Sequence, residues 1–189
     1  MAWLHSVDPA SASGKAKELL DAVLQNRGRL PNMVRLMANS PAALGGYVSF
    51  AAALAGSTLA AEIRDLIAVL VAAHGESDYT LAVASAIARK GGLSDADIVA
   101  ARNAEARDPR TRAALCFSES LLEKRGHVSS SEVDRLMEAG FSDGEVAEIV
   151  ACIALNIYRN YFNLVAAPEI DFPASGAGAA AAATTGGRV

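Results

Sequence analysis

Apolar residues recur at helical spacing along most of the chain, and glycine, proline or capping residues separate one stretch from the next. The first helix is predicted at 13–26, with four aliphatic residues between positions 19 and 24 on one face and Gly28 at its end. No stretch shows strand alternation, so the predicted class is all-α, with about eight or nine helices. The same spacing predicts the other helices at 32–38, 41–55, 59–74, 78–90, 95–103, 109 to about 125, 130–139 and 143 to about 166.

Local capping signals define several of these boundaries. Ser40 precedes Pro41, which is typical of an N-cap followed by a proline at the first helical position. The Ser-x-x-Glu sequences at 129–132 and 142–145 are capping boxes that predict two helix starts. The helix at 59–74 is polar at first and then apolar all round, so we expect its second half to be buried.

Length and composition predict a single helical domain over residues 1–173. A chain of 189 residues can bury a substantial core, and its abundant alanine favours closely packed helices. The segment 174–189 consists mostly of Gly, Ala and Thr with almost no charge. Since this composition offers nothing to pack, a disordered tail is expected there.

Charge and cysteine usage exclude several function classes. The net charge of −4 without a basic cluster argues against a nucleic-acid partner. The start of the chain lacks signal-peptide features, and the apolar run 66–73 is too short to span a membrane, so a cytoplasmic protein without a membrane partner is predicted. Cys116 and Cys152 lie far apart in the sequence and suggest neither a zinc site nor a disulfide framework. We therefore predict no metal and no cofactor.

The segment 65–84 resembles the reactive core of the carboxymuconolactone decarboxylase and alkylhydroperoxidase D family. In the redox branch of that family, a Glu on one helix is followed by Cys-x-x-Cys-x-x-x-His at the start of the next helix. Here Ser77 and Thr80 stand where the cysteines would be, Ala84 stands where the His would be, and Asp65 replaces the Glu. The resemblance therefore implies the family's frame with a degenerate redox site.

The resemblance extends over roughly residues 7–173. It implies an all-helical fold and assembly into dimers, trimers or hexamers. The further segments that carry it are 30–33, 40–44 with Tyr47, 88–94, 108–109, 126–129, 139–142, 160–163 and 169–173.

The substituted residues remove both chemistries that the resemblance would imply. Hydroxyl groups cannot form a disulfide, and without a base they are poor nucleophiles, so the peroxidatic cycle cannot run through Ser77 and Thr80. The lactone decarboxylase branch uses a His and an acidic residue, and Ala84 removes that His. Asp65 keeps a carboxylate that is one methylene shorter, a difference of about 1.5 Å in reach.

Each candidate site residue also has a purely structural interpretation. His74 is either a base near Ser77 or a histidine interacting with the C-terminal dipole of its helix. Asp65 is either a general acid or base, or the partner of a cation such as Arg64 or Arg89. Ser77 is more simply an N-cap, and Thr80 an interior helix residue bonded back to a carbonyl.

Other polar and thiol groups allow similar alternatives. Cys152 lies in an apolar helix, where a buried thiol behaves as a small hydrophobic side chain, and Cys116 is expected to be partly buried. Asn156, Asn160 and Asn163 form a stripe that either lines a pocket or oligomer contact, or supplies buried amides that bond to neighbouring helix ends.

The favoured hypothesis is a non-peroxidatic homo-oligomer of this family with a remnant small-molecule pocket. A second hypothesis is an enzyme that uses Asp65 and His74, with Ser77 or Thr80 positioning the substrate. In a simple hairpin, however, Asp65 would lie about 13 Å before the turn and face residues far from Ser77. The third hypothesis is a thiol peroxidase that acts through Cys116 or Cys152.

Overall fold

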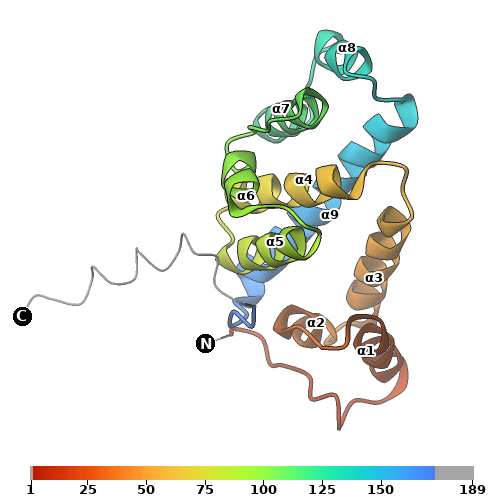
Figure 1. Cartoon of the computed structure of the whole chain (residues 1–189). Helices are drawn as coiled ribbons and strands as arrows, with labels where there is room; N and C mark the ends of the chain where they lie inside the picture. Colours follow the sequence, from red (N-terminus) through yellow and green to blue (C-terminus); the bar gives the residue numbers. More distant parts are fainter. Residues whose placement is uncertain (1, 173–189) are drawn as a thin grey trace, which may run out of the picture.

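A computed structural model describes residues 2–172, and these residues form nine α-helices with no strand among them (Figure 1). The all-α prediction is therefore confirmed. Residue 1 and residues 173–189, which include the predicted tail, lie outside the described residues. The helices are α1 (Gly14–Arg27), α2 (Asn32–Met37), α3 (Pro41–Ala55), α4 (Ala61–His74), α5 (Asp78–Lys90), α6 (Asp95–Ala101), α7 (Pro109–Glu123), α8 (Ser130–Glu138) and α9 (Asp143–Ala166).

The capping predictions hold at the start of several helices. The side chains of Ser40 and Ser77 accept hydrogen bonds from the backbone N–H groups three residues ahead, and both Ser-x-x-Glu sequences form capping boxes. Helix α4 begins two residues later than predicted. The carboxylate of Glu148 on α9 accepts the N–H groups of Thr58 and Leu59 at 3.0 and 2.8 Å, which holds this segment outside the helix.

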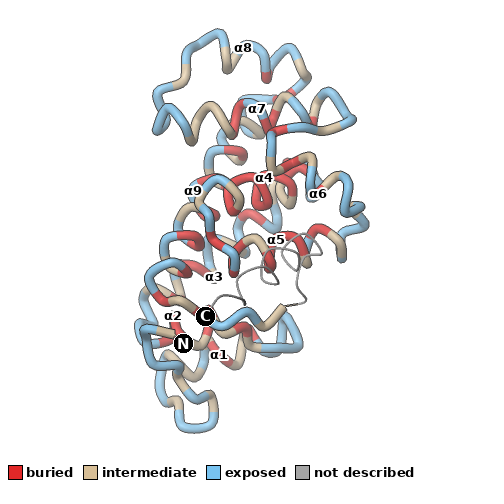
Figure 2. Tube along the Cα trace, turned by 90° about the vertical axis from the view of Figure 1, so that its left-hand side faces the viewer, coloured by how far each residue is buried: buried red, intermediate tan, exposed pale blue. Residues whose placement is uncertain are grey.

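Helices α4 and α9 form the centre of the molecule. Helix α4 packs against α5, α6, α7 and α9. Helix α9 runs along the length of the molecule and also contacts α3 and α8 (Figure 1). Helices α1 to α3 lie at one end of the molecule, and α7 and α8 lie at the other. Buried residues concentrate on α4 and on the helices that pack against it (Figure 2), as predicted for the second half of this helix.

The C-terminal strap, residues 167–172, returns from α9 to the helices near the N-terminus. The Asp171 carboxylate accepts the Asn32 N–H at 3.0 Å and the Tyr79 hydroxyl at 2.7 Å. It also pairs with Arg29 at 2.7 Å, and the Arg29 guanidinium lies 4.1 Å from the centre of the Phe172 ring. These contacts tie the strap to α2 and to the first turn of α5.

Helix α9 is the one helix among residues 2–172 that is long and apolar enough to cross a membrane, with a mean hydropathy of 1.3 over its most apolar window. Half of that window is buried inside the fold, and α9 packs against helices at both ends of the molecule. These are the properties of a central core helix.

Candidate functional site

A three-residue turn joins α4 to α5 and positions Ser77 and Thr80. Helix α4 ends at His74 with Gly75 as its C-cap, and Glu76 adopts a left-handed conformation with φ of 51°. Ser77 then returns to extended backbone and caps α5, where its Oγ accepts the Thr80 N–H at 3.3 Å. The N-cap interpretation of Ser77 is thereby confirmed.

The two hydroxyls at the cysteine positions lie together and are engaged in a buried hydrogen-bond chain. Ser77 Oγ and Thr80 Oγ1 are 2.8 Å apart, and the Asn163 side chain on α9 donates its Nδ2 to Thr80 Oγ1 at 2.9 Å. Thr80 is fully buried, and Ser77 and Asn163 are each only 3% exposed. Ala84, one turn further along α5, is buried as well. These hydrogen bonds link α5 to α9, and neither the Ser77 nor the Thr80 hydroxyl faces solvent.

The asparagine stripe of α9 serves mainly as buried amides. Asn160 donates its Nδ2 to the Val71 carbonyl at the end of α4 over 2.6 Å, and Asn156 donates to the Cys152 carbonyl within α9 at 2.9 Å. The Oδ1 atoms of Asn160 and Asn163 are buried without a partner among the described residues. Of the three amides, Asn160 is the one that bonds to the end of a neighbouring helix, and it also lines a cavity, so both interpretations of the stripe stay open.

Asp65 lies at the opposite end of the helix pair from Ser77. Its Oδ2 would be 3.1 Å from a Cβ placed on Gly91, the residue that follows α5. Burial raises the pKa of the Asp65 carboxyl, while the positive charges of Arg64 and Arg159 oppose that rise. Asp65 makes no ion pair with another described residue, because Arg64 bonds to Leu54 and Ser57 and Arg89 pairs with Asp95. The structure thus keeps Asp65 apart from the hydroxyl chain.

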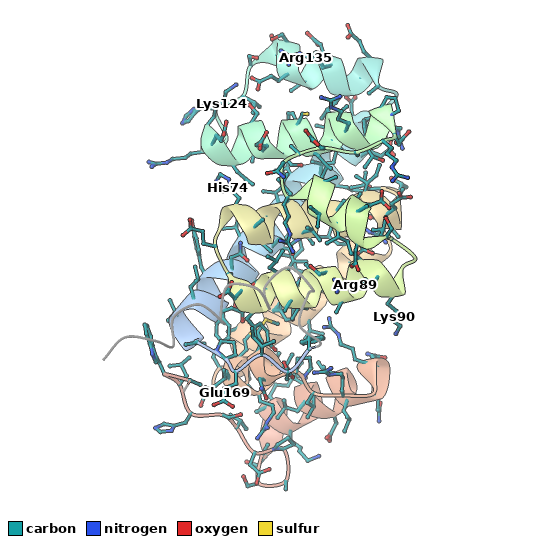
Figure 3. All side chains as sticks on the ribbon, turned by 60° about the vertical axis from the view of Figure 1, so that its left-hand side comes forward. His74, Arg89, Lys90, Lys124, Arg135 and Glu169 are labelled. Carbon is teal, nitrogen blue, oxygen red and sulfur yellow. The ribbon has the colours of Figure 1, made fainter. Side chains whose placement is uncertain are left out.

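His74 is exposed and lies between the end of α4 and α7 (Figure 3). It lines a cavity of about 430 Å³ together with residues of α7 and α9, among them Leu121 and Asn160, and Ser77 is not part of that lining. The four candidate residues therefore divide into a Ser77–Thr80 pair, an isolated carboxylate and a histidine on a different surface.

The two cysteines differ in their exposure to solvent. Both are free thiols. Cys152 is 4% exposed on α9, and burial raises its pKa to about 11, so the thiol stays protonated at neutral pH. Cys116 is exposed on α7, contrary to the expected partial burial, and its Sγ donates to the Ala104 carbonyl at 3.6 Å. Among residues 2–172, no group of three or more His, Cys, Asp or Glu could hold a metal ion.

A larger cavity of about 530 Å³ opens on the face of α5 that carries Tyr79 and Val83. Its walls come from the end of α1, the start of α2, helices α3, α5 and α9, and the C-terminal strap. Sequence analysis did not identify this cavity or Arg159, the charged residue that reaches it from α9. The available signal was an arginine three positions after Asn156, on the same face as the asparagine stripe.

No protein-family model matches the chain, and no curated protein matches it either. Solved structures do match. One is described as the alkylhydroperoxidase AhpD core of an uncharacterized peroxidase-related protein from Ralstonia eutropha JMP134. It has a TM-score of 0.81 and 20% identity, and the match covers 90% of this chain and 92% of that chain.

Two further structures give the same result. An uncharacterized peroxidase-related protein from Silicibacter sp. TM1040 has a TM-score of 0.77 at 18% identity, over 90% of this chain and 94% of that one. The debrominase Bmp8, as a cysteine-to-alanine variant in complex with 2,3,4-tribromopyrrole, has a TM-score of 0.75 at 22% identity, over 93% and 94%. The chain therefore has the helical fold of the alkylhydroperoxidase AhpD core, and the resemblance drawn from its sequence is confirmed at the level of the fold.

Proposed function

We propose that this protein is a non-peroxidatic member of the carboxymuconolactone decarboxylase and alkylhydroperoxidase D family that binds a small molecule. The observation that carries the proposal is the Ser77–Thr80–Asn163 hydrogen-bond chain. It fills the place of the redox motif with two hydroxyls and an amide, all buried. A disulfide cycle needs thiols at this place, and a hydroxyl nucleophile needs an adjacent base.

The surroundings of the two hydroxyls also support a structural role. Thr80 Oγ1 already accepts a hydrogen bond from Asn163, and Ser77 Oγ accepts the Thr80 N–H. Ala84 supplies no base, and His74 lies on another surface. Among residues 2–172, neither His74 nor Glu76 forms a hydrogen bond with these hydroxyls, so neither buried hydroxyl is paired with a base.

An acid–base enzyme centred on Asp65 is the second candidate function. One observation favours it: the Asp65 carboxyl has a raised pKa and makes no ion pair among the described residues, which is typical of many catalytic carboxyls. Asp65 has neither His74 nor a serine or threonine hydroxyl as a hydrogen-bond partner within residues 2–172. We therefore place this function behind ligand binding.

The test is reductant-coupled turnover of an organic hydroperoxide and hydrolysis or decarboxylation of a lactone acid. We expect no turnover from the native protein, from Cys116→Ser/Cys152→Ser or from Asp65→Asn. Ser77→Cys/Thr80→Cys is the matched positive control, because the 2.8 Å separation of the two hydroxyls should allow a disulfide that mass spectrometry detects. Native turnover that is lost in the cysteine-free variant or in Asp65→Asn would contradict the proposal.

The proposal includes a cytoplasmic homo-oligomer that assembles through the C-terminal half of α9. Three apolar residues there face solvent: Tyr161 is 66% exposed, Val165 is 61% exposed and Leu164 is 45% exposed. Tyr158 and the nearby strap residue Ile170 are exposed as well. Contiguous apolar residues of this kind are characteristic of contact surfaces, and aromatic side chains are enriched in interface cores.

Val165→Glu is expected to reduce the mass measured by light scattering after gel filtration, because the carboxylate would be buried at the contact between copies. Val99→Glu on α6 is the matched control, since Val99 is 49% exposed and its helix packs against α4 and α5. This control should keep the native mass. A monomeric native protein, or equal masses for all three proteins, would contradict assembly through α9.

A further inference from the structure

Arg159 is a buried cation without a carboxylate partner. The residue is 8% exposed, and its only hydrogen bond to a described residue runs from Nη1 to the Asn156 amide oxygen at 3.0 Å. Its Nε is buried and has no partner among the described residues. A guanidinium carries five N–H donors, and burying it without an anion is costly. The side chain also lines the 530 Å³ cavity, so an anion inside the cavity could complete its hydrogen bonds.

The charge around this cavity is positive. Arg27, Arg29, Lys90 and Arg159 line it, and no Asp or Glu is part of the lining. Arg29 is paired with Asp171, whereas Arg27 and Lys90 have no ion-pair partner among residues 2–172. Lys90 lies at the end of α5 (Figure 3). Asp65 is close enough to feel the charge of Arg159 but forms no ion pair or hydrogen bond with it. The side chains that line the cavity therefore carry a net positive charge.

Apart from Asn26, the remainder of the lining is apolar or aromatic. Met33, Tyr47, Val83, Leu155 and Phe172 all contribute to it. The hydroxyl of Tyr79, which also lines the cavity, is already used, because it donates to Asp171 and accepts the Met33 N–H at 3.2 Å. Arg159 is thus the buried cation of the lining that keeps hydrogen-bond donors available for a ligand. The volume lies within the range of sites for small organic molecules, about 300–1,000 Å³.

We propose that this cavity binds a small amphipathic anion, whose apolar body lies between α3, α5 and α9 and whose carboxylate or sulfonate group pairs with Arg159. The proposal rests on the ligand-binding part of the proposed function and not on the absence of redox turnover. It names the chemical class of the ligand and places the site on the face of α5 that carries Tyr79 and Val83.

The test compares two dyes with the same aromatic body, 1-anilinonaphthalene-8-sulfonate and the uncharged N-phenyl-1-naphthylamine. Arg159→Met should weaken binding of the sulfonate dye by about tenfold or more and change the affinity of the neutral dye by less than about threefold. Arg159→Lys should restore part of the sulfonate affinity. Arg135→Met removes an exposed cation on α8 and should change neither dye. Ala51→Trp, which fills the cavity from α3, should weaken both dyes.

A second measurement on the native protein keeps the test decisive if Arg159→Met does not fold. Octanoate should displace the neutral dye at a concentration about tenfold lower than 1-octanol, although the alcohol is the more apolar of the two. Absence of dye binding to the native protein, equal loss of both dyes in natively folded Arg159→Met, or stronger displacement by octanol would each overturn the proposal. Those results would leave the absence of hydroperoxide turnover untouched. Turnover, in turn, would overturn only the non-peroxidatic assignment.

Discussion

Thr80→Val is expected to lower the free energy of unfolding by about 1–3 kcal/mol, although the two side chains have nearly the same shape. The Thr80 hydroxyl accepts the Asn163 Nδ2 donor and bonds to Ser77 Oγ inside the protein. Valine would leave the buried Asn163 amide without any partner among residues 2–172, because its Oδ1 already has none. The cost of an unsatisfied buried donor exceeds the value of the bond itself.

The measurement is the midpoint of urea unfolding at constant m-value. Thr58→Val is the matched control, because it removes the same hydroxyl from an exposed bond to Glu148 and should cost well under about 1 kcal/mol. Equal effects of the two substitutions, or an effect below about 0.5 kcal/mol for Thr80→Val, would contradict a structural role for the buried chain. The result also bears on function, since hydroxyls that maintain the α5–α9 contact are tied to packing and not to chemistry.

The helix boundaries that could be predicted are those set by residues close in sequence. Ser40 and Ser77 bond to backbone groups three residues away, and the bounds of α3 and α5 agree with the predicted ranges 41–55 and 78–90. The predicted start of α4 was wrong because the contact that sets it comes from a residue far away in the sequence. Glu148, about 90 positions further along the chain, binds the N–H groups at Thr58 and Leu59. Helical periodicity carries no information on such a contact.

In the candidate site, too, features within one helix could be predicted from the sequence, whereas contacts between helices could not. The sequence identifies the Ser77–Thr80 pair, which lies on one helix, and the asparagine stripe, which lies on another. It does not show that Asn163 meets Thr80, since that contact depends on how α9 crosses α5. The cavity around Arg159 was missed for the same reason, because its walls come from elements spread between Asn26 and Phe172.

Gly75→Ala is expected to lower the free energy of unfolding by about 2–4 kcal/mol, which combines overpacking with the loss of one buried hydrogen bond. A Cβ at position 75 would collide with Asn160 Nδ2 and lie 3.1 Å from Asn160 Cγ. Asn160 cannot move away freely, because the same Nδ2 donates to the Val71 carbonyl at 2.6 Å. The backbone is not the obstacle, since Gly75 has a φ of −87°, which alanine adopts without strain.

Gly46→Ala is the matched control for this substitution. Gly46 lies inside α3, and a Cβ there would meet nothing within 4 Å. The change should therefore stabilise the protein by about 0.4–1 kcal/mol, since alanine restricts the unfolded chain and favours the helix. Opposite signs for the two glycine substitutions, measured by urea unfolding, would separate the contact with Asn160 from any general effect of replacing glycine.

A double-mutant cycle with Asn160→Ala identifies the colliding group. Asn160→Ala alone should cost about 1–3 kcal/mol, because it removes the bond that holds α9 to the last turn of α4. In that background Gly75→Ala meets no amide, so its own cost should fall by at least about 1 kcal/mol. Strict additivity of the two changes would show that Gly75 is required for a reason other than Asn160. Strong coupling would mean that Gly75 is needed at the turn between α4 and α5 for the approach of α9, and that its presence there says nothing about catalysis.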